Sequence, residues 1–129
     1  MSNFALEISD LRKVYSGGTE ALKGISLKVK EGDFYALLGP NGAGKSSTIG
    51  IIGTLVTKTS GTVKIFDYDI DKNVSLAKSI LGVVSQEINF SQFEKVIDIV
   101  STQAGYYGIR SSIAKPKVNE MLKRLGLWD

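Results

Sequence analysis

Hydrophobic and polar residues alternate along the first third of the chain, a pattern typical of half-buried β-strands. The alternation is clearest over residues 5–11, with one slip before Leu11, and over residues 25–29. Residues 34–38 form an uninterrupted apolar run, which predicts a buried strand. We therefore expect residues 1–38 to form a small, largely antiparallel sheet that leads into this last strand.

The rest of the chain mixes short strands with helical repeats. Residues 48–56 carry apolar side chains on most sides, as a buried helix does. Further along, two longer segments repeat their apolar residues at the i, i+3, i+4 spacing of a helix face. The pattern predicts strands at 62–66, 67–70 and 81–84, a short helix at 75–80, and helices at 93–107 and 114–125. Together these segments indicate an α/β fold.

A glycine-rich loop separates the strand at 34–38 from the helix at 48–56. It fits G-x-x-x-x-G-K-[ST], the phosphate-binding pattern called Walker A, and the strand before it and helix after it make a chance match less frequent. Its glycines allow backbone N–H groups to turn inward around an anion. We expect Lys45 to reach the β- and γ-phosphates of ATP, Ser46 to ligate Mg²⁺ and Ser47 to reach the α-phosphate. The loop consists of Gly39, Pro40, Asn41, Gly42, Ala43, Gly44, Lys45, Ser46 and Ser47.

The composition narrows the range of other functions. Cysteine is absent, which excludes disulfides and Cys-based zinc sites. The net charge is only +3 and the lysines are scattered, whereas nucleic-acid binders usually cluster them, so we expect no nucleic-acid partner. The N-terminus does not have the pattern of a signal peptide, and the longest apolar stretch is too short to span a bilayer. We expect any membrane role to depend on a partner.

These segments together resemble the ATP-binding cassette (ABC) ATPases of transporters, in particular the ATP-binding subunits of bacterial ABC-2-type exporters. The resemblance extends from about Ala5 to Trp128 and is carried by residues 14–15, 21–27, 34–48, 60–63, 82–86 and 126–128. It implies an incomplete P-loop NTPase core with an N-terminal antiparallel β-subdomain and a C-terminal helical segment. The implied sections are 1–38, the P-loop to Q-loop region 39–86, and the start of a helical subdomain at 87–129.

The resemblance also implies roles for two residues outside the loop. Tyr15 matches the aromatic residue that stacks on adenine; the alternative is a tyrosine that merely closes a strand. Gln86 matches the Q-loop glutamine, which contacts Mg²⁺ or the attacking water, although many relatives have proline where this chain has Ser85. The implied catalytic residues are thus Lys45 and Gln86, and the implied Mg²⁺ ligands are Ser46 and Gln86.

The function implied by the resemblance is to bind Mg-ATP and energise transport through a separate ABC-2-type permease. Such a subunit pairs with a second ATP-binding subunit as a homodimer. It lies in the cytoplasm at the inner face of the plasma membrane. A complete ABC domain also has a Leu-Ser-Gly-Gly-Gln-like signature, a Walker B Asp-Glu pair and a switch histidine, and this sequence has none of them.

The missing motifs leave more than one interpretation open. The chain is either the N-terminal half of an exporter ATPase or a truncated, inactive remnant that binds nucleotide or permease. A small kinase is less favoured, since few arginines are present to bind an acceptor. We expect little ATP hydrolysis by this chain alone, because no carboxylate is supplied as general base. We also expect poor solubility, because the strands at 34–38 and 81–84 would have bare apolar edges.

Overall fold

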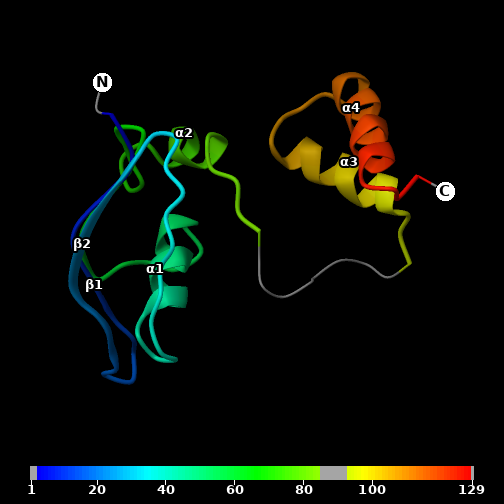
Figure 1. Ribbon diagram of the computed structural model, residues 1–129. Coiled ribbons are helices and arrows are strands. Elements are labelled where there is room, and N and C mark those ends of the chain that lie inside the picture. The colour runs from blue at the N-terminus through cyan, green and yellow to red at the C-terminus, as the bar shows by residue number, and fades with distance from the viewer. Residues whose placement is uncertain (1–2, 85–92, 129) are drawn as a thin grey trace. The chain divides into compact units, whose positions relative to one another are not determined.

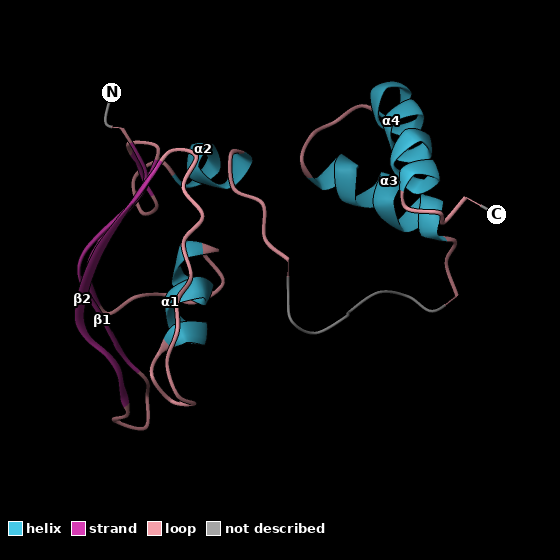
Figure 2. Cartoon of the chain, in the orientation of Figure 1, coloured by secondary structure: helices cyan, strands magenta, loops and turns pink. Residues whose placement is uncertain are grey.

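The computed structural model describes residues 3–84 and 93–128 of the chain. Contacts divide the protein into two units, Met1–Val83 and Val84–Asp129. The first contains a sheet with two helices and the second contains a pair of helices (Figures 1 and 2). Ser85 and Gln86 lie outside the described residues.

A four-stranded antiparallel sheet in the order β2-β1-β3-β4 dominates the first unit. Leu6 of the central strand faces Val29 of β2 on one side and Ile65 of β3 on the other. The antiparallel sheet expected near the N-terminus is therefore confirmed, and it also includes two strands that follow the glycine-rich loop. The strands are β1 (Phe4–Val14), β2 (Glu20–Lys30), β3 (Ser60–Ile65) and β4 (Tyr68–Asp69).

The central strand contains a bulge at Asp10. The register of β1 against β2 shifts between Ile8 and Leu11, and Asp10 takes a positive φ of 44°. Gly24 of β2 and Gly61 of β3 border the bulge with φ of 98° and 89°. A Cβ at Gly24 would collide with the Asp10 side chain, and one at Gly61 would collide with the Asp10 backbone. A glycine on each neighbouring strand therefore makes room for the bulge.

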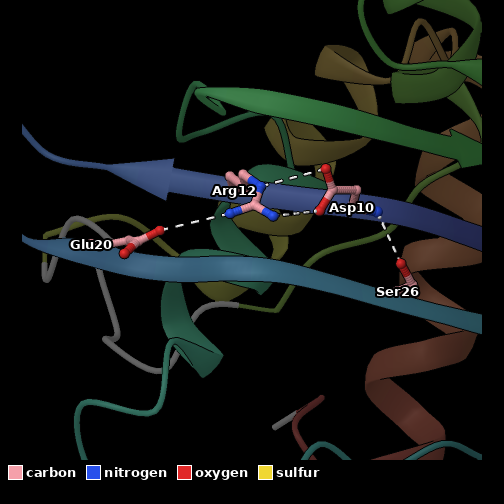
Figure 3. A network of polar contacts seen from close by, with 4 residues as sticks. All are labelled: Asp10, Arg12, Glu20 and Ser26. Carbon is pink, nitrogen blue, oxygen red and sulfur yellow. Dashed lines mark hydrogen bonds and ion pairs between the residues drawn. The ribbon is translucent and has the colours of Figure 1, made fainter.

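Polar contacts on the sheet surface brace this bulge (Figure 3). The Asp10 backbone N–H donates to Ser26 Oγ at 2.9 Å. Arg12 donates to the Asp10 carboxylate, with Nη2 at 3.0 Å from Oδ1, and lies 3.9 Å from Glu20. Because these groups are exposed, their ion pairs add little to the stability of the fold. We infer that the network mainly holds the local backbone in place.

The hydrophobic core lies on one face of the sheet, beneath α1 (Lys45–Ile52) and α2 (Val74–Ser79). Burying each large aliphatic side chain stabilises the unit by about 1.5–3 kcal/mol. The helix expected at 48–56 is confirmed in type but begins and ends earlier, and the helix expected at 75–80 matches α2. The buried core residues are Ile8, Leu11, Leu22, Ile51, Val63, Ile65, Ile70 and Ala77.

Two predicted strands are wrong. Residues 34–38 and 81–84 contain no β-strand, and neither segment joins the sheet in the described part of the chain. Phe34, Leu38 and Val84 are 100%, 88% and 99% exposed. A strand forms only where a neighbouring strand accepts and donates its ladder hydrogen bonds, and the described residues provide none here. Both runs are apolar, but an apolar run forms a strand only when a neighbouring strand is available to pair with it.

The second unit is a helical pair, as expected, made of α3 (Val96–Tyr106) and α4 (Ser111–Arg124). Gly126 follows α4 with φ of 68°, the left-handed conformation in which a glycine often ends a helix, and the Leu127 N–H donates to Leu122 O at 2.9 Å. Pro116 lies inside α4, which begins at Ser111. In residues 3–84 and 93–128, no helix has the length and apolar character needed to span a membrane.

Candidate phosphate-binding site

The glycine-rich loop ends where α1 begins. Gly42 and Gly44 have positive φ of 86° and 84°, conformations that L-residues with a Cβ rarely adopt. Gly44 occupies the N-cap position of α1, and the Ala43 N–H donates to Pro40 O at 3.2 Å to close a turn. The chain thus reverses tightly and starts a helix at Lys45, as the motif predicted.

The ammonium group of Lys45 lies against the loop backbone. Its Nζ donates to the carbonyl oxygens of Gly39 and Pro40, each at 2.6 Å. The Lys45 side chain therefore folds back over the start of the loop. It connects the carbonyl groups of Gly39 and Pro40 to the first turn of α1. This position concentrates positive charge beside the N-terminus of the helix.

The N-terminus of α1 is suited to an anion. Within the described residues, no side chain caps it and its first turn contains no acidic residue. The first N–H groups of a helix have no intrahelical acceptor and carry the positive end of its dipole. Together with Lys45 they form a site that favours a phosphate group.

Thr48 stabilises the first turn of α1 from the buried side of the helix. It is 2% exposed, and both its backbone N–H and its Oγ1 donate to Gly44 O at 2.9 Å. No role was expected for it from the sequence. The sequence feature that could have indicated its role is a hydroxyl residue one helical turn after a glycine N-cap. Such a residue can donate two hydrogen bonds to the carbonyl oxygen of that glycine.

Tyr15 is brought to this loop by the end of β1. Its phenol oxygen lies 3.0 Å from Ser47 Oγ on α1, and the residue remains 41% exposed. The ring is therefore partly accessible beside the phosphate-binding loop, and an accessible aromatic face is what stacking on a base needs. The structure thus brings together Tyr15 and Ser47, which were expected to contribute to one site.

For the remaining residues expected to bind nucleotide or Mg²⁺, the structure shows fewer contacts. Asn41, Ala43 and Ser46 are exposed on the loop and the first turn of α1. In the described part of the chain, no cluster of three or more His, Cys, Asp or Glu residues could hold a metal ion. Mg²⁺ in nucleotide sites commonly takes one or two protein oxygens and completes its shell with phosphates and water, so the exposed Ser46 hydroxyl fits that chemistry. Gln86 lies outside the described residues.

The helical unit carries its own apolar hollow. A cavity of about 230 Å³ lies between α3 and α4, and almost every group that lines it is hydrophobic. A second hollow of about 420 Å³ lies near the start of α3 and the end of α4. The first is lined by Val100, Gln103, Ala104, Tyr107, Ile109, Ala114, Lys117, Val118 and Met121.

Comparison with known proteins finds relatives in one family. A family model described as ABC transporter matches residues 22–129. The linearmycin resistance ATP-binding protein LnrL of Bacillus subtilis (strain 168) is 37% identical over 96% of this chain and 40% of its own length. The daunorubicin/doxorubicin resistance ATP-binding protein DrrA of Streptomyces peucetius is 32% identical over 97% of this chain and 38% of its own. The chain thus spans less than half the length of these relatives.

Solved structures share the fold. An ATP-binding subunit of an ABC transporter matches with a TM-score of 0.82 at 24% identity, covering 95% of this chain and 51% of that one. The ATP-binding cassette MJ0796, solved as a dimer in a post-hydrolysis state with ADP and Pi, matches with a TM-score of 0.77 at 26% identity. That match covers 92% of this chain and 56% of MJ0796.

Proposed function

This chain belongs to the ABC transporter family, and on that premise we propose that it is the nucleotide-binding part of an exporter's ATP-binding subunit. The relatives LnrL and DrrA are named as resistance ATP-binding proteins, which supports an export function. The same names give no support to the alternative of an inactive remnant. The energy source would be ATP, bound as its Mg²⁺ complex.

The observation that carries the proposal is the position of Lys45 at the N-terminus of α1. Its ammonium group and the uncapped N–H groups of the helix would hold the β- and γ-phosphates. Ser46 would supply a hydroxyl ligand to Mg²⁺, and Ser47 would reach the α-phosphate. When bound, Mg²⁺ would supply positive charge that neutralises the charge developing on the phosphates. Tyr15 would stack on the adenine from the end of β1.

We assign Gln86 the role that its position in the family implies, contact with Mg²⁺ or the attacking water. The role follows from the motif alone. With Lys45 it makes up the catalytic pair that this chain would contribute.

A membrane partner is part of the proposal. The helical unit offers an apolar hollow between α3 and α4, and a concave, largely hydrophobic surface is the usual form of a protein-binding groove. We propose that it receives a segment of an ABC-2-type permease, and that two ATP-binding subunits work together. The chain would then lie on the cytoplasmic side of the plasma membrane.

ATP binding is tested by Lys45→Ala. Charge-assisted hydrogen bonds contribute about 1.5–3 kcal/mol each, so we expect Mg-ATP to bind on the order of tenfold to a hundredfold more weakly in calorimetry. Lys64→Ala on β3 removes the same charge from an exposed position and should leave the affinity within about twofold, since distant surface charges are screened. Equal affinity in Lys45→Ala and the unaltered chain would refute the proposed site.

A further inference from the structure

Lys13 is held in place at the end of β1, next to the proposed base-stacking residue. Its Nζ donates to Thr57 O at 2.7 Å, in the segment between α1 and β3. The same Nζ lies over the Tyr15 ring, 4.7 Å from the ring centroid. One ammonium group therefore contacts the ring and a separate segment of backbone at once.

Other contacts fix the backbone around Lys13 and Tyr15. The Val14 N–H donates to Thr59 Oγ1 at 2.9 Å, and the Thr59 N–H donates to Arg12 O at 2.9 Å. The Tyr15 N–H donates to Thr19 O at 3.0 Å within the β1–β2 turn. Thr59, in the segment after α1, thus hydrogen-bonds to the end of β1 on both sides of Lys13.

The Tyr15 ring is consequently held at two points. The Ser47 hydroxyl is 3.0 Å from its phenol oxygen, and the Lys13 ammonium lies over its face. A cation over one face of an aromatic ring leaves the opposite face for a second π-system. Holding the ring before a base arrives removes part of the ordering entropy that binding would otherwise require.

We propose that Lys13 is a positioning residue for nucleotide binding, which orients the Tyr15 ring so that one face is presented to the base. The inference rests on the proposed function, because it assumes that Tyr15 stacks on adenine. Lys13 acts through Tyr15 and has no assigned contact with phosphate. Its effect should therefore depend on the presence of a base in the ligand.

The test compares Mg-ATP with inorganic tripolyphosphate, which carries the phosphates without a base. In Lys13→Met, which keeps an apolar stem and removes the charge, we expect ATP to bind about two- to fivefold more weakly. Tripolyphosphate should bind equally well to Lys13→Met and the unaltered chain, which also reports that the variant's loop is folded. Lys13→Arg keeps a cation that can lie over the ring and should restore ATP affinity.

Lys28→Met is the matched control. Lys28 Nζ lies 4.8 Å from the Phe4 ring centroid and 2.8 Å from Glu7, so this variant also removes a lysine charge and a cation–π contact from the sheet. It should not change ATP affinity. Equal loss of ATP and tripolyphosphate in Lys13→Met, or no loss of ATP, would overturn the inference alone. Failure of the unaltered chain to bind either ligand would overturn the proposed function and the inference with it.

Discussion

Gly44 lies directly against the side chain of Leu22, so that the N-cap of α1 rests on β2. A Cβ at Gly44 would approach Leu22 Cδ2 to 2.5 Å and the Ala21 carbonyl oxygen to 2.6 Å. Gly44 also has a φ of 84°. Space and backbone conformation both require glycine at this point, which joins the candidate phosphate site to the sheet.

Gly44→Ala should therefore destabilise the first unit more than Gly42→Ala. Both positions have positive φ, but a Cβ at Gly42 meets open space. We expect a loss of about 1 kcal/mol for Gly42→Ala from conformational strain, and about 1–3 kcal/mol more for Gly44→Ala from overpacking. Urea unfolding followed by circular dichroism measures the difference. Equal midpoints for the two variants would show that the contact with Leu22 is relieved at little cost.

Base selectivity should be weak if Tyr15 provides most of the contact with the base. Stacking contributes about 1–3 kcal/mol and depends little on base identity, so ATP and GTP should bind within about an order of magnitude of each other. Tyr15→Ala should weaken both by similar factors. Tyr15→Phe keeps the ring and removes the hydroxyl that contacts Ser47. It should retain most of the affinity in competition titrations, and strong rejection of GTP would indicate a hydrogen-bonding base pocket instead.

The bulge at Asp10 should make Gly61 sensitive to substitution. Gly61→Ala would place a Cβ against the Asp10 backbone at a φ of 89°, and backbone has little freedom to move away. We expect a loss of about 2 kcal/mol or more in the free energy of unfolding. Gly105→Ala in α3 is the control, because a Cβ there meets nothing within 4 Å and alanine favours a helix by up to about 1 kcal/mol. Similar stabilities for the two variants would contradict the packing argument.

Acid should weaken the turn between β4 and α2. The Asp71 N–H donates to Asp69 Oδ1 at 2.9 Å, and this hydrogen bond is the main cause that lowers the pKa of Asp69 from its ordinary value of 3.8. A carboxylate whose pKa is lowered by folding stabilises the fold above its unfolded pKa, and the effect is lost as the pH falls through its folded pKa. Asp69→Asn should thus be destabilising at pH 7.

The difference in stability between Asp69→Asn and the unaltered chain should shrink as the pH falls below the ordinary pKa of 3.8, because the carboxylate becomes protonated. Urea midpoints at several pH values would follow this change. The exposed site limits its size, so the sign and the pH window are the informative results. A difference that stays constant over this range would mean that the charge of Asp69 plays no part.

The sequence predicted the glycine-rich loop and the helix that follows it better than the contacts that hold them in place. The spacing of Gly39, Gly44 and Lys45 identified the loop, because each position is constrained by local geometry. The slip in the alternation before Leu11 marked the place of the bulge. Lys13 had no such signal, because its contact with Thr57 depends on how the chain folds back. The contact of Thr48 with Gly44 is local, within the first turn of α1, and its spacing from the glycine could have indicated it.

The two incorrect strand predictions have a different cause. Residues 34–38 and 81–84 are apolar in the way that buried parallel strands are, and that pattern was interpreted as structure. Strand formation depends on pairing with another segment, which a run of apolar residues does not specify. Helical segments were predicted more accurately, since their hydrogen bonds lie within the segment itself.

The order of the strands has a consequence for synthesis on the ribosome. β1 and β2 are neighbours in sequence and can pair as soon as both have emerged. The other edge of β1 pairs with β3, where Leu6 faces Ile65, and must wait for the loop and α1. At about 5–20 residues per second this delay lasts on the order of several seconds. Throughout that interval a nascent chain presents an unpaired β1 edge to its neighbours on the same messenger RNA.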